Sequence, residues 1–282
     1  MIQTFVALGD SFTEGVGDPR PDGSWRGWAD RAAERMAASS PGLRYANLAI
    51  RGKVVRQVIE DQVPVAEVMR PDLVSLAAGG NDLLRPGTEP DDLAQSFNAA
   101  VERLAAAAGR VLLFTGFDPG VFPVIRMIRG KVAAYNAHIR IIAARHDCLL
   151  ADLWSMRVLA DSRMWSPDRL HLSAEGHRRV ALRACEVLGV PVDEDWREPL
   201  AVPLRGPASG YRTVPAWAGA RWQDARWARA YAAPWVRRRL RGVSSGDGQV
   251  PKRPELIPAL PPPPPAPRPP GPRPAPAPRR RP

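Results

Sequence analysis

The sequence has 282 residues, of which 45% are hydrophobic and 24% charged, and its net charge is +11. This length suits one large α/β domain, or one domain with an extension. No stretch reaches the ~20 apolar residues of a membrane span. Residues 1–8 lack the basic start of a signal peptide and run directly into a Gly-Asp-Ser turn. We therefore expect a cytoplasmic protein without a membrane span.

Strands and helices are predicted to alternate over residues 1–190. Short apolar runs predict strands at residues 2–8, 44–49, 73–77, 110–115 and 148–153. Helical patterns cover residues 27–39, 54–69, 90–108, 131–146 and 173–188. Pro64 should kink or divide the second of these helices. The alternation predicts a three-layer α/β/α domain with a parallel sheet of about five strands and flavodoxin-like layering.

Residues 191–242 form a predicted extension that is rich in Trp and Arg. Residues 196–242 hold five of the nine Trp and ten Arg. Trp217, Trp222 and Trp227 are five residues apart, so on a helix each would turn about 140° from the last and they would not share a face. This argues against an amphipathic membrane helix. We expect the segment to pack back on the domain through its indoles, with a surface-binding arm as the alternative.

Residues 243–282 are predicted to be a disordered, basic, Pro-rich tail. Residues 251–282 contain 16 prolines, a composition typical of polyproline II or disorder. Residues 197–282 carry 17 Lys and Arg against 4 Asp and Glu, whereas residues 1–196 carry 23 against 25. A basic tail can bind nucleic acid, anionic lipid or an acidic partner. Only three of the 40 cations are Lys, however, which is typical of a GC-rich coding sequence. We expect a spacer and no nucleic-acid binding, and leave open a protein partner that docks on the prolines.

No cofactor or metal is expected. Cys148 and Cys185 lie in apolar stretches without a CxxC spacing, which predicts buried free thiols. The glycine-rich loop 9–17 lacks the GxGxxG and Gly-Lys-Ser/Thr patterns of nucleotide-binding loops. Glu14 and Asp82 lack a surrounding ligand cluster, so we expect them to be solvated or to stabilise loops.

Ser11 is a candidate nucleophile. It follows the first predicted strand in Gly9-Asp10-Ser11, at the sheet edge where ligands bind in parallel α/β folds. A Gly-Asp-Ser tripeptide alone is more often a turn or a helix cap. The chain has no GxSxG motif, which disfavours the ordinary α/β-hydrolase arrangement.

His171 is the candidate base, with Asp168 three residues before it in the same loop. A serine hydroxyl needs a base to take its proton, and imidazole in turn needs an acceptor on its other nitrogen. The other three histidines fall within predicted helices or at a helix end. A DxxH pattern by itself is equally compatible with a surface cap.

Gly52 and Asn81 are candidate oxyanion donors at the same predicted sheet edge. Acyl transfer places charge on the carbonyl oxygen, and each positioned donor is worth ~2.7–4 kcal/mol. The Gly52 backbone N–H is open to close approach, and Asn81 carries a side-chain amide. Either could equally be a turn residue. The apolar loop 117–128 could line an acyl pocket or belong to the core, and we favour the pocket.

Four blocks together resemble the SGNH hydrolase superfamily, the GDSL-type esterases and lipases of bacteria. They occur in the family's order, over about residues 3–190: Gly9 to Gly15, Asn47 to Gly52, Gly79 to Asp82 and Asp168 to His171. The first block reads Gly-Asp-Ser-Phe where the family name implies Leu. The resemblance implies that Ser11 is nucleophile and first oxyanion donor, Gly52 the second and Asn81 the third, with His171 as base and Asp168 as its partner.

The implied reaction is hydrolysis of a carboxylic ester through an acyl-enzyme, without a metal or cofactor. The expected substrate is a small or lysolipid-like ester. Removal of O-acetyl groups from a carbohydrate is the alternative reaction, since a fold does not decide between substrates. An alternative of another class is a binding protein that acts through its Pro-rich basic tail.

Overall fold

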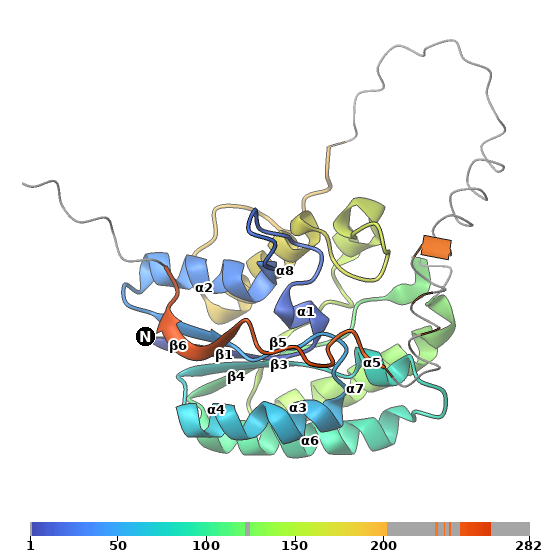
Figure 1. The fold of residues 1–282 in the computed structure, drawn as a ribbon, viewed down its shortest axis with the longest axis horizontal. Helices are drawn as coiled ribbons and strands as arrows, with labels where there is room; N and C mark the ends of the chain where they lie inside the picture. The colour runs from blue at the N-terminus through green and yellow to red at the C-terminus, as the bar shows by residue number, and fades with distance from the viewer. Residues whose placement is uncertain are drawn as a thin grey trace, which may run out of the picture.

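The fold is a six-stranded, mostly parallel sheet between two layers of helices, which confirms the predicted α/β class (Figure 1). The computed structural model describes residues 2–121, 125–201, 229–230, 234, 237 and 243–260. The strands are β1 (Thr4–Gly9), β2 (Arg44–Asn47), β3 (Leu73–Ala77), β4 (Arg110–Phe114), β5 (Leu149–Ala151) and β6 (Arg253–Pro258). Their order is β5-β4-β3-β1-β2-β6, and only β6 pairs antiparallel.

Helices cover both faces of this sheet (Figure 1). One face carries α1 (Ser11–Glu14), α2 (Gly27–Ser39) and α8 (Ala174–Leu188). The other carries α3 (Val55–Asp61), α4 (Val63–Met69), α6 (Pro90–Ala107) and α7 (Arg129–Arg145). The short helix α5 (Gly80–Leu83) follows β3, and 3₁₀ turns occur at Pro119–Val121, Arg126–Ile128, Arg157–Ala160 and Ser162–Met164. The predicted division of residues 54–69 is confirmed, but the break falls at Gln62, and Pro64 lies in the first turn of α4.

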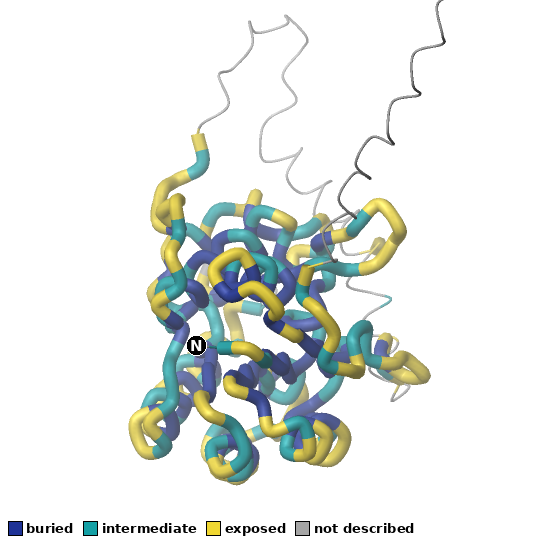
Figure 2. The backbone as a smooth tube through the Cα atoms, turned by 90° about the vertical axis from the view of Figure 1, so that its left-hand side faces the viewer, coloured by how far each residue is buried: buried dark blue, intermediate teal, exposed yellow. Residues whose placement is uncertain are grey.

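Alternate residues of each central strand feed two separate cores. In β1, Phe5 packs in the core under α2 and α8, whereas Val6 and Leu8 pack in the core under α6 and α7. Successive strand residues point to opposite faces, and both faces are covered, so a continuous apolar run is required. Burying each such side chain stabilises the fold by ~1.5–3 kcal/mol. Buried residues accordingly gather in the middle of the molecule, and exposed residues lie mostly at its periphery (Figure 2).

The strand order places a binding crevice between β1 and β3. Chain connections from β1 lead to β2 on one side, and those from β3 lead to β4 and β5 on the other. In open parallel sheets, ligands bind outside the carboxyl ends of the strands at such a reversal point. The loops after β1, β2 and β3 therefore meet where the sequence places its candidate residues.

The predicted disorder from residue 243 is wrong for residues 243–260, which we call the C-terminal strap. Its strand β6 pairs with β2, with Tyr45 opposite Ile257. Pro254 and Pro258 contributed to the prediction of disorder, but both lie in an edge strand, which tolerates proline where a central strand does not. The edge position also explains why the sheet has six strands where about five were expected. Residues 261–282 lie outside the described residues.

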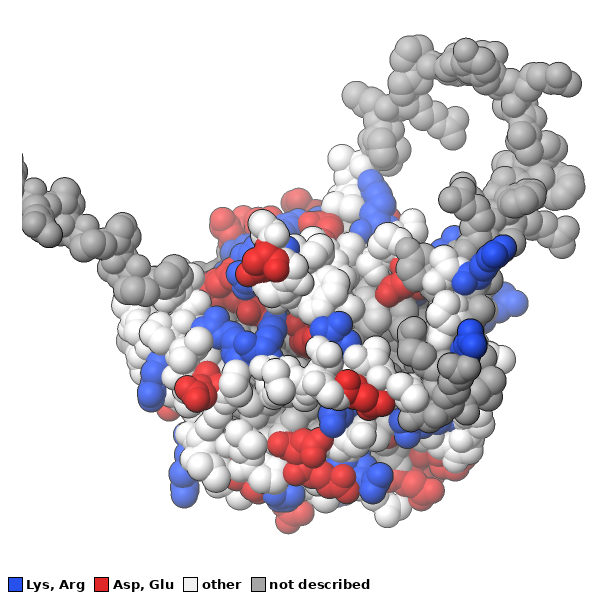
Figure 3. Space-filling model, viewed as in Figure 1, with Lys and Arg blue, Asp and Glu red and all other residues white. Residues whose placement is uncertain are grey.

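The predicted extension at residues 191–242 is described only in part. Trp196 packs into the core beside α8, and its indole N–H donates to Glu186 Oε2 at 2.8 Å. The packed domain thus continues past the predicted boundary at residue 190. The other four tryptophans of the extension lie outside the described residues. Basic and acidic side chains are interspersed over the described part of the face in Figure 3.

Candidate active site

Ser11 is positioned by a close approach of β1 to β3. Gly9 ends β1 with φ +147°, and a Cβ there would lie 2.3 Å from the Ala77 carbonyl oxygen. Only glycine fits this contact. Asp10 then caps α1 by accepting a hydrogen bond from the Phe12 N–H at 3.1 Å. Ser11 is consequently the first residue of a helix that starts at the sheet edge.

A buried amide that the sequence did not reveal fixes the peptide groups before Ser11. Gln62, at the break between α3 and α4, accepts from the Gly9 N–H at 2.8 Å and donates to the Gly9 carbonyl at 2.9 Å. Its side chain is almost fully buried. Because a buried amide that loses its partners costs ~1–3 kcal/mol, this pair holds the end of β1 in one geometry.

His171 and Asp168 form a hydrogen-bonded pair in the loop before α8. His171 Nδ1 lies 2.6 Å from Asp168 Oδ2. Asp168 Oδ1 also accepts from the backbone N–H groups of Leu170 and His171, both at 3.0 Å, and from the Ser166 hydroxyl at 2.6 Å. Burial alone would raise the pKa of Asp168, but the bonds from His171 and Ser166 hold it well below its ordinary value. An ionised Asp168 assigns the proton of the neutral ring to Nδ1 and leaves Nε2 unprotonated, so that Nε2 can accept a hydrogen bond or a proton.

Gly52 lies in a loop that follows β2 and is held by Glu14. Glu14, the last residue of α1, accepts from the Arg51 N–H at 2.6 Å and also pairs with the Arg51 guanidinium. Gly52 has φ +77°, a conformation that favours glycine. Glu14 thus stabilises a loop, which is one of the two roles that the sequence predicted for it. Asp82 does so as well, because it accepts from the Val55 N–H at 3.1 Å.

Asn81 and Asp10 meet at the carboxyl ends of β3 and β1. Asn81 Nδ2 donates to Asp10 Oδ2 and to the Lys53 carbonyl, both at 3.0 Å. Burial raises the pKa of Asp10 to about 6, against the lowering effect of its bond from the Phe12 N–H. The pair links the loops that follow β1, β2 and β3. Donation by Asn81 to a substrate oxygen requires it to share or exchange one of these bonds.

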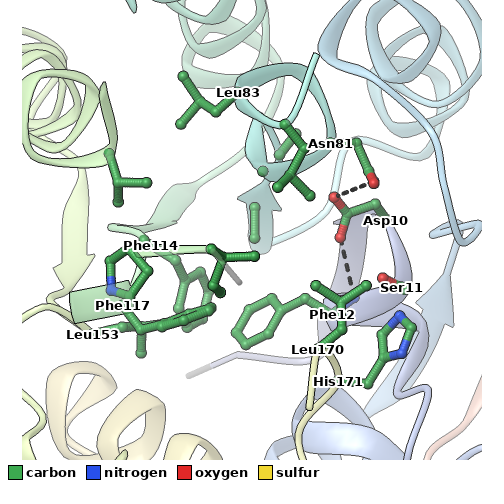
Figure 4. A pocket seen from close by; sticks show the side chains of 18 of the residues that line it. Asp10, Ser11, Phe12, Asn81, Leu83, Phe114, Phe117, Leu153, Leu170 and His171 are labelled. Carbon is green, nitrogen blue, oxygen red and sulfur yellow. Dashed lines mark hydrogen bonds between the residues drawn. The ribbon is translucent and has the colours of Figure 1, made fainter. Parts of the chain in front are cut away.

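One pocket brings four of the five predicted site residues together. Ser11, Gly52, Asn81 and His171 line a cavity of about 260 Å³, and Asp168 reaches it through its bond to His171. Ser11 and His171 lie at one end, and Phe117 and Leu153 at the other (Figure 4). Most of the remaining lining is apolar, including Phe12, Phe114, Ile128, Val132, Ile139, Trp165, Leu170 and Leu172. The site thus combines a polar end with an apolar interior.

The apolar loop 117–128 contributes to this pocket, as expected from the sequence. Phe117, Pro119, Ile125 and Ile128 all line it, and residues 122–124 lie outside the described residues. Phe117 also packs its ring on Trp165, with the ring centroids 4.4 Å apart. The loop therefore serves both as a pocket wall and as part of the packed structure.

Val243, Ser244 and Ser245 of the C-terminal strap also line the pocket, which sequence reasoning missed. The strap is more than 190 residues from the Gly52 loop in sequence, so no local spacing could connect the two. A usable signal was present in the turn-forming run Ser-Ser-Gly-Asp-Gly at residues 244–248, just ahead of Lys252. The Pro-rich composition of the residues that follow outweighed this signal and favoured a prediction of disorder.

The chain belongs to the GDSL-like lipase/acylhydrolase family, whose model matches residues 7–179. The matched range includes Ser11, Gly52, Asn81, Asp168 and His171. It ends before the C-terminal strap. The protein is therefore a hydrolase of a family that acts on acyl esters, with the SGNH fold that its four blocks indicated.

Several solved structures share this fold. LAE5, an alpha/beta hydrolase enzyme from the metagenome of Lake Arreo, Spain, is 22% identical with a TM-score of 0.58, covering 67% of this chain and 95% of its own. TesA is 23% identical with a TM-score of 0.56, over 66% and 98% of the two chains. Axe2, an acetylxylan esterase from Geobacillus stearothermophilus, is 22% identical with a TM-score of 0.54, over 70% and 96%. At these identities the likeness shows the fold alone.

No curated protein matches the chain significantly. Within the described residues, no helix combines the length and the apolar character needed to cross a membrane.

Proposed function

We propose that the protein is a serine esterase that hydrolyses carboxylic esters with an apolar acyl chain through an acyl-enzyme. One observation carries the proposal: Ser11, Gly52, Asn81 and His171 line the polar end of a pocket whose interior is apolar. An apolar acyl chain can fill that interior while its carbonyl carbon reaches Ser11.

In the proposed reaction, His171 Nε2 takes the proton of Ser11 as the hydroxyl attacks the ester carbonyl. Asp168, ionised and hydrogen-bonded to Nδ1, stabilises the imidazolium that forms. The backbone N–H groups of Ser11 and Gly52 and the amide of Asn81 stabilise the charge on the carbonyl oxygen. The imidazolium then protonates the leaving alcohol. Water repeats the sequence, releases the acid and restores Ser11.

Covalent labelling by a fluorophosphonate probe tests the nucleophile. We expect the probe to modify Ser11 in the wild-type protein, as read from the labelled peptide by mass spectrometry, and to modify neither Ser11→Ala nor His171→Ala. Labelling of a different serine, or undiminished labelling in His171→Ala, would contradict the assignment. Ser96→Ala, on the exposed surface of α6, serves as the matched control.

The lining of the pocket favours longer acyl chains over acetyl groups. An acetyl group would leave the apolar wall formed by residues such as Phe114, Leu153 and Trp165 without contact, and each buried CH₂ is worth ~0.8 kcal/mol. We therefore expect p-nitrophenyl octanoate to be hydrolysed with a higher kcat/KM than p-nitrophenyl acetate. The reverse preference would favour the alternative, carbohydrate O-deacetylation.

A protein partner for the Pro-rich tail and a cytoplasmic location stay predictions from the sequence. Of this predicted tail, residues 261–282 lie outside the described residues.

A further inference from the structure

The C-terminal strap is anchored by a buried lysine. Lys252 Nζ donates to the carbonyl oxygens of Glu14 at 2.6 Å, Arg26 at 2.8 Å and Trp25 at 3.0 Å, and forms an ion pair with Asp30. The Lys252 side chain is 17% exposed and that of Asp30 is 4% exposed. An ammonium has three N–H donors, and here they meet four acceptors. The strap is thereby fixed to the end of α1 and to the start of α2.

The same anchor reaches the Gly52 loop through Glu14. The Glu14 carbonyl accepts from Lys252, while its carboxylate holds the backbone and guanidinium of Arg51. Each link is a charge-assisted hydrogen bond, the stronger kind in proteins. Lys252 is thus connected by two contacts to the residue that precedes Gly52.

A turn at the start of the strap lies directly on this loop. The Ser244 N–H donates to Asp247 Oδ2 at 2.8 Å, and the Ser244 hydroxyl oxygen accepts from the Gly246 N–H at 3.2 Å. A Cβ on Gly246 would lie 2.0 Å from the Arg51 carbonyl oxygen, and a Cβ on Gly52 would lie 2.1 Å from Ser244 Oγ. Gly246 therefore packs against the backbone of the loop, and Gly52 packs against the Ser244 side chain, with no room for a further side chain at either glycine.

The turn supplies a polar wall at the open side of the pocket. Val243, Ser244 and Ser245 line the pocket next to Gly52, and Val243 is 50% exposed. The pocket interior, in contrast, is formed by buried apolar residues such as Phe114 and Leu153 (Figure 4). An ester with its acyl chain in the interior and its carbonyl oxygen at Gly52 directs its alcohol part towards the open side.

We propose that Ser244 and Ser245 bind the alcohol part of the ester and favour alcohols that carry free hydroxyl groups, with Lys252 as the positioning residue that holds their turn in place. The inference rests on the proposed esterase function and extends it to the substrate class, monoesters of a polyol such as glycerol. Within the described residues, the Ser244 hydroxyl accepts one bond and donates none, so its proton is available to a substrate oxygen.

The test compares two esters with the same acyl chain, 1-monooctanoylglycerol and methyl octanoate. The quantity measured is the ratio of their kcat/KM values, in which the acyl contribution cancels. We expect the ratio to fall roughly 3-fold in Ser244→Ala or Ser245→Ala and ~10-fold in the double variant, as expected for one or two lost hydrogen bonds. Ser96→Ala should leave the ratio at its wild-type value.

The outcomes separate this inference from the proposed function. A wild-type protein that hydrolyses both esters, with a ratio unchanged in the double variant, overturns the role of the turn and leaves the esterase intact. A wild-type protein that hydrolyses neither ester overturns both.

Lys252 is tested by the same ratio in the double variant Lys252→Met/Asp30→Asn, which removes both buried charges together. We expect the ratio to fall as it does in the serine variants, because the turn is no longer held against the Gly52 loop. Lys131→Met is the matched control, since it removes a lysine bound to the Thr88 carbonyl outside the pocket lining. A wild-type ratio in a double variant that is folded by circular dichroism overturns the positioning role.

Discussion

The proposed base and the proposed oxyanion donor line the same pocket but are held by different kinds of contact. The His171 ring is bonded to Asp168, which also accepts from Ser166, and these three residues lie within six positions of the chain. The Gly52 loop is held by Glu14 and by the strap around Ser244, which are distant in sequence. A catalytic site can therefore combine a part that is built locally with a part that exists only in the complete fold.

The largest effect on activity should come from a substitution in the locally built part of the site, at His171. His171→Ala removes the proposed base, and we expect kcat for p-nitrophenyl octanoate to fall at least ~10³-fold. The Asp168 bond to the Leu170 backbone remains, so the unfolding midpoint should stay close to that of the wild type. His138→Ala is the control, because His138 pairs with Asp91 at 2.6 Å outside the pocket lining. Equal losses in the two variants would contradict the role of His171.

Disrupting the Lys252 anchor of the C-terminal strap, in the long-range part of the site, should first lower the free energy of unfolding. Lys252→Met leaves the buried Asp30 with Arg20, at 3.4 Å, as its remaining ion-pair partner, and loss of one partner of a buried pair costs up to ~3–5 kcal/mol. We expect urea denaturation to show this decrease in the free energy of unfolding. The double variant Lys252→Met/Asp30→Asn should recover much of it. A single variant as stable as the wild type would show that the strap is not anchored by this pair.

Gly52→Ala tests the contact between the loop and the strap. The added Cβ would meet Ser244 Oγ at 2.1 Å and strain a residue at φ +77°, so we expect kcat to fall ~10²-fold as the donor is displaced. Gly42→Ala is a matched control, because Gly42 has φ +90° but nothing within 4 Å of its Cβ position. Similar losses of activity in both would point to general backbone strain instead of the strap contact.

The smallest effect concerns the carboxyl group of Asp10. Asp10 has a pKa of about 6, above its ordinary 3.8, so between these pH values the folded protein binds more protons than the unfolded chain. Asp10 therefore makes the free energy of unfolding decrease as the pH rises from about 4 to about 6. Asp168 acts in the opposite sense, since its lowered pKa stabilises the fold above pH 4 and this stabilisation is lost in acid.

We expect Asp10→Asn to flatten the decrease between pH 4 and 6 and to raise the free energy of unfolding at pH 7 by ~1 kcal/mol. Urea denaturation at pH 4, 5, 6 and 7 measures both effects. Asp147→Asn, at an exposed position, should leave the profile unchanged. An unaltered slope in Asp10→Asn would show that Asp10 is not the group responsible.

The locally built part of the molecule was predictable from the sequence. The apolar run before Ser11, the DxxH spacing of Asp168 and His171, and the alternation of strands with helices all depend on neighbours in the chain. The placement of Gly52 and Asn81 at one sheet edge followed from parallel topology alone. Their roles in catalysis stay proposals.

The long-range part was not predictable for physical reasons. Gln62 reads as an ordinary helix residue, and nothing nearby shows that its amide is buried against Gly9. Lys252 lies among prolines, where composition predicts disorder. A side chain's burial depends on elements that approach it from elsewhere, and one sequence read locally does not contain that information.

The position of β6 also determines when the enzyme can be completed during synthesis. Strand β2 emerges from the ribosome early, but its outer neighbour is encoded more than 200 residues later. Until residues 243–258 have left the exit tunnel, the nascent domain carries an open sheet edge and lacks one wall of its pocket. Open edges invite pairing with other chains. Translation of residues 243–258 should therefore both protect the nascent chain from association and complete the proposed substrate site.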